Sequence, residues 1–221
     1  MNPEHQRAVY RRRFAGIEER RLQVWQTLAR HYFAKWVKPT DTVLDLGSGY
    51  CEFINNIPAI HKYALDSNPA TKSKAAAGVT VLSQDATEPW ALPAESLDVV
   101  FSSNFLEHLP AKSDLAFCIS EAYRVLRPQG LLMALGPNIR FCYDEYWDFW
   151  DHYLPLSDRS LVEVMELRGF RSELVVPRFL PFAMATRVPQ STFLIRFYLA
   201  LPWAQRLWGK QFLVIARKPL R

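Results

Sequence analysis

Three short segments of the sequence carry glycines and carboxylates in an order that could bind a nucleoside. They are Gly47-Ser48-Gly49, Asp66-Ser67 and Asp85-Ala86, and each follows an apolar run. The two glycines would let the backbone approach a ligand closely. Asp66, nineteen residues after Gly47, could accept both hydrogen bonds of a ribose diol, and Asp85 could accept from an adenine amino group. Together the segments predict a ligand that contains adenosine.

The glycine segment also distinguishes between two adenosine-containing cofactors. A dinucleotide site requires G-x-G-x-x-G, because the third glycine lets a helix pack closely beside the pyrophosphate. Glu52 stands at that third position, and near a helix start its charge would repel a pyrophosphate. Glu52 and Asp45 would instead tolerate a cofactor that lacks phosphate and carries a sulfonium cation. The pattern therefore predicts S-adenosylmethionine rather than NAD.

Strands and helices alternate along the chain in the manner of an α/β fold. Apolar runs predict strands within residues 41–49, 61–69, 79–87, 97–105, 131–138, 172–179 and 210–218, whereas helical spacing predicts helices within 15–37, 51–57, 113–130 and 156–170. The last of these helices opens at Ser157 and closes at Gly169. Such alternation predicts a mostly parallel sheet, whose ligands bind at the carboxyl ends of the strands.

The segment FCYDEYWDFWDHY, residues 141–153, crowds aromatic rings and carboxylates together after the fifth predicted strand. On a helix, one face would carry Tyr143, Trp147, Trp150 and Leu154, and another Asp144, Asp148 and Asp151. One hypothesis is that Tyr143, Tyr146, Trp147 and Trp150 form the wall and lid of an acceptor site. The alternative is that the rings pack the helix onto the core. Three carboxylates on one face could bind Mg²⁺, but such a run is more often solvated, so no metal is predicted.

Two histidines are candidates for a general base that would deprotonate a hydroxyl acceptor. His152, with Asp148 or Asp151 nearby, would make an oriented base, and His108 is the second candidate. The unperturbed pKa of histidine, near 6.5, suits proton transfer at neutral pH. The alternative for either residue is a polar histidine at the surface.

Five segments in sequence order resemble the successive motifs of class I S-adenosylmethionine-dependent methyltransferases. They are VLDLGSGYCEF, ALDSNP, LSQDATE, DVVFSSNFLEHLP and RVLRPQGLLMALGPN, and they cover roughly residues 41–140. The group that modifies small molecules, lipids and sugars is the most similar. Beyond Asn138 there is only a vaguer likeness to methyltransferases of polysaccharide and glycolipid pathways.

The resemblance implies a Rossmann-like, seven-stranded, mostly parallel sheet with the last strand antiparallel. It also implies that Gly47 and Gly49 border the methionine part of the cofactor and that Asp66 holds the ribose. Asp85 with Ala86 would contact the adenine, and Asn104 would lie near the methionine tail.

The charges of the chain suggest an anionic partner. Residues 1–38 carry a net charge of +6, residues 39–168 a net charge of −9, and residues 169–221 a net charge of +8. Basic ends of this kind attract a membrane surface, a nucleic acid or a phosphorylated substrate. The alternative is that the ends are simply solvated.

An aromatic and basic insertion lies between the last two predicted strands. Its sequence, LPFAMATRVPQSTFLIRFYLALPWAQRLWG, includes Arg187, Arg196 and Arg206 and is typical of an element in a membrane interface. A lid or a dimer element is the alternative. No apolar run reaches the roughly 20 residues of a membrane span, and no signal core is present. Three cysteines without a CxxC pair favour a reducing cytoplasm, so the prediction is a cytoplasmic protein. Peripheral contact with the inner face of a membrane is a hypothesis beside it.

These observations predict one domain over residues 1–221. A helical cap occupies 1–38, the cofactor-binding core 39–179, a helical insertion or lid 180–208 and the final strand 209–221. The predicted function is methyl transfer to a small-molecule, sugar or lipid-linked hydroxyl, with the oligomeric state open. RNA methylation, favoured by the basic ends, and cofactor binding without catalysis are the alternatives. Nucleic acid is the less favoured partner, because the SSNFLEH segment lacks the proline motifs of DNA methyltransferases.

Overall fold

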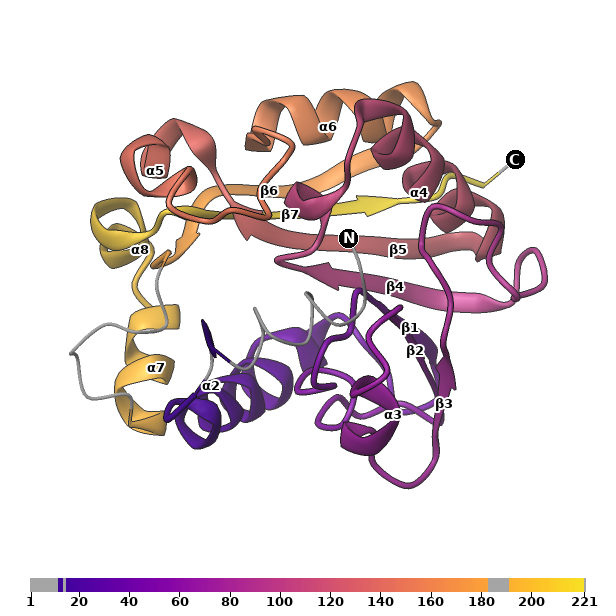
Figure 1. Cartoon of the computed structure of the whole chain (residues 1–221), viewed down its shortest axis with the longest axis horizontal. Coiled ribbons are helices and arrows are strands. Elements are labelled where there is room, and N and C mark those ends of the chain that lie inside the picture. The colour runs from indigo at the N-terminus through magenta and orange to yellow at the C-terminus, as the bar shows by residue number, and fades with distance from the viewer. Residues whose placement is uncertain (1–11, 14, 183–190, 221) are drawn as a thin grey trace.

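A seven-stranded sheet with helices on both faces forms the computed structural model, which describes residues 12–13, 15–182 and 191–220 (Figure 1). The strand order is β3-β2-β1-β4-β5-β7-β6. The strands are β1 (Thr42–Leu46), β2 (His61–Leu65), β3 (Val79–Leu82), β4 (Leu97–Ser103), β5 (Leu126–Pro137), β6 (Arg171–Leu180) and β7 (Gln211–Arg217). Strands β1 to β5 run parallel, and β7 is antiparallel to both β5 and β6. The predicted α/β class, parallel sheet and antiparallel last strand are confirmed.

The helices form one layer on each face of the sheet (Figure 1). An apolar core lies between the sheet and each of these layers. One layer holds α4 (Lys112–Val125), α5 (Ile139–Tyr146) and α6 (Asp158–Leu167), and the other α2 (Glu18–His31), α3 (Thr71–Lys74) and α7 (Thr192–Leu199). Short 3-10 helices span η1 (Phe33–Lys35) and η2 (Leu106–His108). On β1, Val43 faces one core while Leu44 and Leu46 face the other. The central strands are apolar on both sides because both faces are covered.

Two predicted helices differ from the structure. Residues 51–57 form successive turns rather than a regular helix, and Cys51 there has a positive φ of 61°. The helix predicted over 113–130 ends at Val125, and β5 begins at the next residue. Pro128 favours an early end, because its ring disfavours helical conformation at Arg127, the residue before it. By contrast, α6 is capped as predicted, since the Ser157 hydroxyl accepts from the Ser160 N–H.

The aromatic segment 141–153 does not form one continuous helix. Helix α5 already leaves helical geometry at Cys142 and ends at Tyr146. The Tyr146 hydroxyl donates to the Leu154 carbonyl and accepts from the Leu156 N–H. These two hydrogen bonds hold residues 154–156 against the end of α5. The predicted helix faces of rings and of carboxylates are therefore wrong, because a tertiary contact ends the helix before either face is complete.

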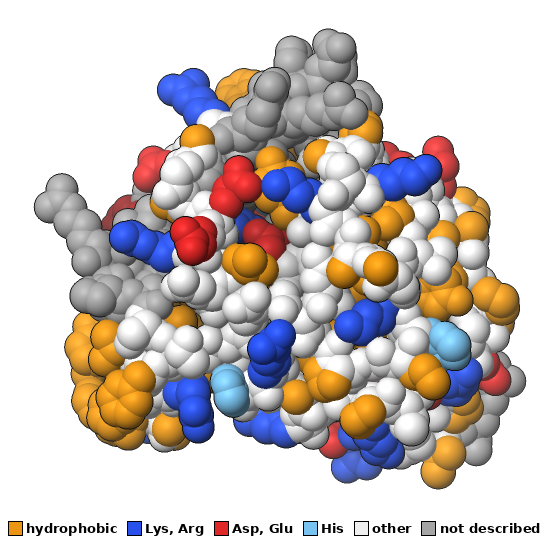
Figure 2. All heavy atoms as spheres, turned by 90° about the horizontal axis from the view of Figure 1, so that it is seen from below, with side chains coloured by type: hydrophobic (Ala, Val, Ile, Leu, Met, Phe, Trp, Pro, Cys, Tyr) orange, Lys and Arg blue, Asp and Glu red, His pale blue; other side chains and the backbone are white. Residues whose placement is uncertain are grey.

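The insertion between β6 and β7 is helical, as predicted, with α7 followed by α8 (Pro202–Trp208). Arg187 of the insertion lies outside the described residues. Ile195, Tyr198 and Leu199 pack against the core and Ala204 is buried. The other large apolar side chains of α7 and α8 are exposed: Phe193, Leu194, Phe197, Trp203, Leu207 and Trp208. Figure 2 shows orange side chains gathered at the left edge, on the side where Figure 1 places α7, with basic side chains beside them. Within the described residues, no helix has the length and apolar character to cross a bilayer.

Candidate active site

The loop after β1 folds into a tight turn whose backbone conformation favours glycine. Gly47 and Gly49 have φ values of +70° and +51°, in the left-handed region. The ring of Phe105, from the loop after β4, lies directly against Gly47. A Cβ added to Gly47 would come within 2.2 Å of the Phe105 Cγ atom. Gly47 thus keeps the loops after β1 and β4 in close contact.

Asp66 connects the loops at the ends of β1 and β2. Its carboxylate accepts from the Gly49 N–H and the Asn68 N–H, both at 2.7 Å. Burial raises the pKa of Asp66, although these two hydrogen bonds oppose the shift. Its neighbour Ser67 is exposed. The carboxylate therefore stabilises the glycine turn directly, besides any contact that it makes with a ligand.

Three carboxylates surround the glycine turn and repel one another. Burial raises the pKa of Asp45 well above its usual value, and the charges of Glu52 and Asp66 raise it further. Glu52 pairs with Arg21 of α2, with the Nε and Oε1 atoms 2.9 Å apart. A cationic ligand placed beside this group would be favoured, because it would relieve the repulsion.

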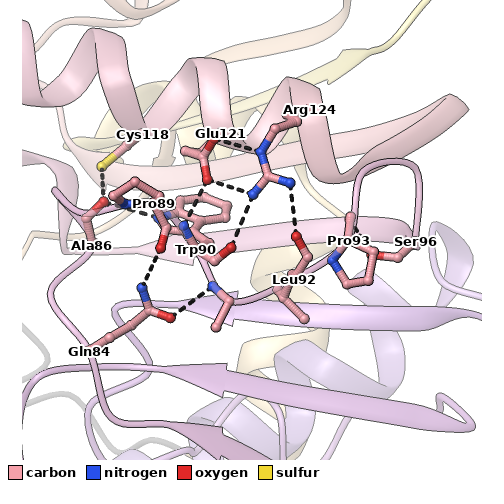
Figure 3. Close-up of polar contacts among 11 residues, drawn as sticks. Gln84, Ala86, Pro89, Trp90, Leu92, Pro93, Ser96, Cys118, Glu121 and Arg124 are labelled. Carbon is pink, nitrogen blue, oxygen red and sulfur yellow. Dashed lines mark hydrogen bonds and ion pairs between the residues drawn. The ribbon is translucent and has the colours of Figure 1, made fainter.

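The loop after β3 is held to α4 by a polar network (Figure 3). The Ala86 carbonyl accepts from Trp90 Nε1 at 3.0 Å, and the Cys118 thiol lies 3.3 Å from the same oxygen. Arg124 donates to both carboxylate oxygens of Glu121 and to the carbonyls of Trp90 and Leu92. Helix α4 thereby fixes the position of Ala86. Asp85 is exposed, and its carboxylate accepts from the backbone and hydroxyl of Thr87.

Replacing Arg124 with alanine should lower the free energy of unfolding by about 1–3 kcal/mol, because Glu121 and two carbonyls lose their donor. The hydrogen bond from Arg124 is the main cause of the lowered pKa of Glu121. The stabilisation that this interaction contributes is therefore fully present above the pKa that Glu121 has in the unfolded chain. It is lost as pH falls through the lower pKa that Glu121 has in the folded protein. Denaturant unfolding of both proteins at pH 7 and pH 4 measures this. Arg127→Ala, which breaks an exposed pair with Asp98, is the control and should cost less than about 1 kcal/mol.

One cavity of about 210 Å³ extends from the glycine turn to a cluster of titratable side chains. The residues at its first end are Asp45, Gly47, Ser48, Gly49, Glu52, Ser103 and Asn104, and those at its second end are Arg13, Glu107, His108, Phe149, His152 and Phe182. The cavity thus unites Asp45, the glycine turn, Asn104 and both candidate bases. Its lining does not include four other predicted cofactor contacts, Asp66, Ser67, Asp85 and Ala86.

The aromatic segment reaches the cavity through Phe149 and the candidate base His152, and not through the predicted acceptor residues. Phe149 and His152 line it, and their rings stack at a centroid distance of 4.9 Å. The predicted acceptor residues lie elsewhere: Tyr146 is fully buried, and Tyr143, Trp147 and Trp150 are exposed. Asp148, a predicted partner of His152, is also exposed. A role for these side chains in acceptor binding stays a prediction.

The second end of the cavity is built around Asp151. Its carboxylate pairs with Arg13 at 2.5 Å, and its backbone carbonyl lies 2.6 Å from His108 Nδ1. Burial would raise the pKa of Asp151, but the hydrogen bond from Arg13 and the charge of His108 outweigh it and lower that pKa. Asp151 therefore orients His108, whereas the sequence suggested that it would orient His152.

His152 is the more buried of the two histidines, with 8% of its surface exposed. Burial, followed by the charge of His108, lowers the pKa of His152 to about 4. Glu107, fully buried beside His108, was missed by the sequence reasoning, although it precedes His108 in the NFLEHLP segment. Arg13, Phe149 and Phe182 were also missed, and no pattern in the sequence connects them to the site.

Comparison with known families gives a match over residues 44–134, to the family model Methyltransf_11, described as a methyltransferase domain. This range contains the glycine turn, both strand-end aspartates, Glu107 and His108. A search of curated proteins found no match to the chain.

Solved structures share the fold over nearly the whole chain. A S-adenosylmethionine-dependent methyltransferase from Archaeoglobus fulgidus is 22% identical, with a TM-score of 0.69, and the match covers 93% of this chain and 99% of that one. A methyltransferase complexed with the Trm112 activator from Haloferax volcanii is 17% identical, with a TM-score of 0.66 and 93% of each chain covered. The N-methyltransferase NodS from Bradyrhizobium japonicum, solved with S-adenosyl-L-homocysteine, is 12% identical, with a TM-score of 0.61 and coverage of 93% and 89%.

Proposed function

We propose that the protein transfers a methyl group from S-adenosylmethionine to a hydroxyl group of a sugar, lipid-linked or other small acceptor. The match of residues 44–134 to a methyltransferase-domain model supports this proposal. One observation carries the proposal. A single cavity joins the glycine turn to the group formed by Glu107, His108 and His152. A methyl donor at the first end and an acceptor at the second would therefore meet within it.

The chemistry of the first end fits S-adenosylmethionine. The positive φ values of Gly47 and Gly49 bring the backbone close to a ligand, and three mutually repelling carboxylates favour a cation. The sulfonium of S-adenosylmethionine is such a cation, and the molecule lacks the phosphates that these carboxylates would repel. We propose that Asp66 binds the ribose and that Asp85 with Ala86 binds the adenine.

Bound S-adenosylmethionine supplies a methyl group that its positively charged sulfur makes reactive. The chain's main task is then to align the acceptor for in-line transfer and to exclude water, which the rings of Phe149 and Phe182 favour. An acceptor hydroxyl must also lose a proton, and we place His108 ahead of His152 for this step. His108 Nδ1–H donates a hydrogen bond to the Asp151 carbonyl, so the lone pair that could accept a proton is on Nε2. Burial lowers the pKa of His152 to about 4, which makes it a weak base at neutral pH.

A lipid-linked acceptor is supported by the exposed surface of α7 and α8. Phe193, Phe197 and Trp203 are each more than half exposed, and Arg196 and Arg206 lie on the same helices. Aromatic side chains interleaved with basic ones are typical of helices that lie in the interface of an anionic membrane. Such contact would bring a membrane-anchored acceptor close to the protein.

Membrane contact should be visible as co-flotation of the protein with vesicles that contain anionic lipid. A variant carrying Phe193→Ser, Phe197→Ser and Trp203→Ser should lose most of this binding, because its apolar contact area is removed. Leu167→Ser, which removes an exposed apolar residue from α6 on the opposite layer, is the control and should float like the original protein. Full recovery of the original protein in the unbound fraction would contradict the proposal.

The acceptor class can be tested by transfer of label. The protein is incubated with methyl-labelled S-adenosylmethionine and a bacterial lysate separated into lipid, sugar and nucleic-acid pools. Label in lipid or sugar, stable to conditions that cleave methyl esters, is the expected result. Label in RNA would replace the proposal with RNA methylation, and binding without transfer to any pool would favour a non-catalytic role.

A further inference from the structure

We infer that Glu107, His108 and His152 together bind one divalent transition-metal ion at the second end of the cavity. Each residue offers one ligand atom, and these atoms all lie within 4.8 Å of one another. All three side chains line the cavity, so an ion held by them would be open to an acceptor. The inference rests on the proposed function, which it deepens by assigning the means of activating the acceptor.

The orientation of His108 is that of a metal ligand. Its Nδ1–H donates to the Asp151 carbonyl at 2.6 Å, so Nε2 carries the free lone pair. Nε2 lies 3.9 Å from Glu107 Oε1, on the side of the ring away from Asp151. Metal-binding histidines almost always donate their second ring N–H to a carbonyl or a carboxylate in this way. Arg13 supports the arrangement by holding Asp151 in place.

His152 supplies an independent observation. The residue is more than nine-tenths buried, yet its Nδ1 atom has no hydrogen-bond partner among the described residues. The His152 ring lies beside that of His108, with 5.0 Å between the ring centroids. A buried polar atom without a partner is unfavourable, and an ion in the cavity would provide that partner.

Glu107 brings the negative charge that a cation requires. The residue is only 2% exposed, and the nearby Arg13 is paired with Asp151. A buried carboxylate without a directly bonded cation is costly, and a divalent ion would offset this cost.

The ligand types indicate the class of metal. Two imidazoles and one carboxylate suit Zn²⁺, Mn²⁺ or Fe²⁺, whereas Mg²⁺ and Ca²⁺ prefer oxygen ligands alone. Three protein ligands leave coordination positions open, which is typical of a catalytic rather than a structural site. The site differs from the Mg²⁺ site considered for the carboxylates of residues 144–151, because it uses none of them.

A metal ion at this position would activate the acceptor hydroxyl by binding its oxygen and lowering its pKa. The hydroxyl proton would pass to water. The oxygen lone pair would then form the bond to the methyl carbon, while the electrons of the carbon–sulfur bond stay on sulfur. In this arrangement His108 would serve as a ligand rather than as the general base, because the ion would make the hydroxyl acidic enough for water to accept its proton.

The test uses the untagged full-length chain, stripped with a chelator and titrated with Zn²⁺ and with Mn²⁺ in a calorimeter. One ion per chain is expected for at least one of the two metals. Glu107→Gln and His152→Asn should each weaken that binding by at least about 100-fold, while His61→Asn, at an exposed histidine, should bind like the original protein. Affinity for S-adenosylmethionine, measured on each stripped sample, should stay within about threefold and shows that the variants are folded.

Two results would overturn the inference. One is the absence of stoichiometric binding of either metal by the stripped protein. The other is methyl transfer to the labelled acceptor pool that continues unchanged after chelation. Failure of the proposed function is distinguishable from both, because it would appear as lack of S-adenosylmethionine binding or of transfer even with metal restored.

Discussion

Gly47→Ala should weaken the binding of S-adenosylmethionine by about 100-fold or more. Two costs combine at this residue. The left-handed φ of +70° costs a residue with a Cβ about 1–2 kcal/mol, and the contact of 2.2 Å with the Phe105 ring adds about 1–3 kcal/mol of overpacking. Each 1.4 kcal/mol is a factor of ten in affinity. If the glycine turn moves to relieve the strain and the steric contact, the two costs together are large enough to remove most of the binding. Calorimetric titration measures the effect directly.

Gly78→Ala provides a matched control for the backbone cost. Gly78 has a φ of +88°, but a Cβ there would meet nothing within 4 Å. Its substitution should lower stability by about 1–2 kcal/mol and leave cofactor affinity unchanged. Combining Gly47→Ala with Phe105→Ala should recover part of the lost affinity, because the steric contact is gone. If Gly47→Ala alone bound the cofactor normally, the assignment of this turn to the cofactor would be wrong.

His108→Asn should reduce kcat by about 10²- to 10⁴-fold while leaving the Kd for S-adenosylmethionine unchanged. Asparagine can still donate to the Asp151 carbonyl in place of Nδ1, so the loop keeps its shape. It has no counterpart to Nε2, the atom that faces Glu107 and the cavity. Steady-state kinetics with the acceptor pool found by labelling, together with calorimetry of cofactor binding, make the comparison.

The same substitution at His152 distinguishes two mechanisms. If His108 acts alone as a base, His152→Asn should change kcat by less than about tenfold. If both histidines bind a metal ion, the two variants should lose comparable activity, because each removes one ligand. An unchanged kcat in His108→Asn would remove this residue from the mechanism altogether.

The sheet and the first end of the cavity were predictable because they depend on local patterns. An apolar run that is followed by Gly47-Ser48-Gly49, or that ends at Asp66, predicts a strand and the turn after it from a few neighbouring residues alone. In a parallel sheet the carboxyl ends of neighbouring strands lie at one edge, so these segments had to meet. The seven-stranded sheet with an antiparallel last strand followed from the family resemblance rather than from the residues alone.

The second end was not predictable in the same way, because tertiary contacts create it. Arg13 and Asp151 are 138 residues apart, and their pairing decides that Asp151 orients His108. Helical spacing in the aromatic segment was misleading for the same reason, since the contact of the Tyr146 hydroxyl with Leu154 turns the chain back. Helical spacing predicts which side chains share a face only where the chain remains helical.

The position of β7 within the sheet has a consequence for how the protein is made. In the described structure, β7 lies between β5 and β6, although it follows both in the chain. During synthesis, β6 and the aromatic insertion leave the ribosome before the strand that joins them to the rest of the sheet. A nascent chain halted ahead of Gln211 would present two open strand edges, each able to pair with another polypeptide.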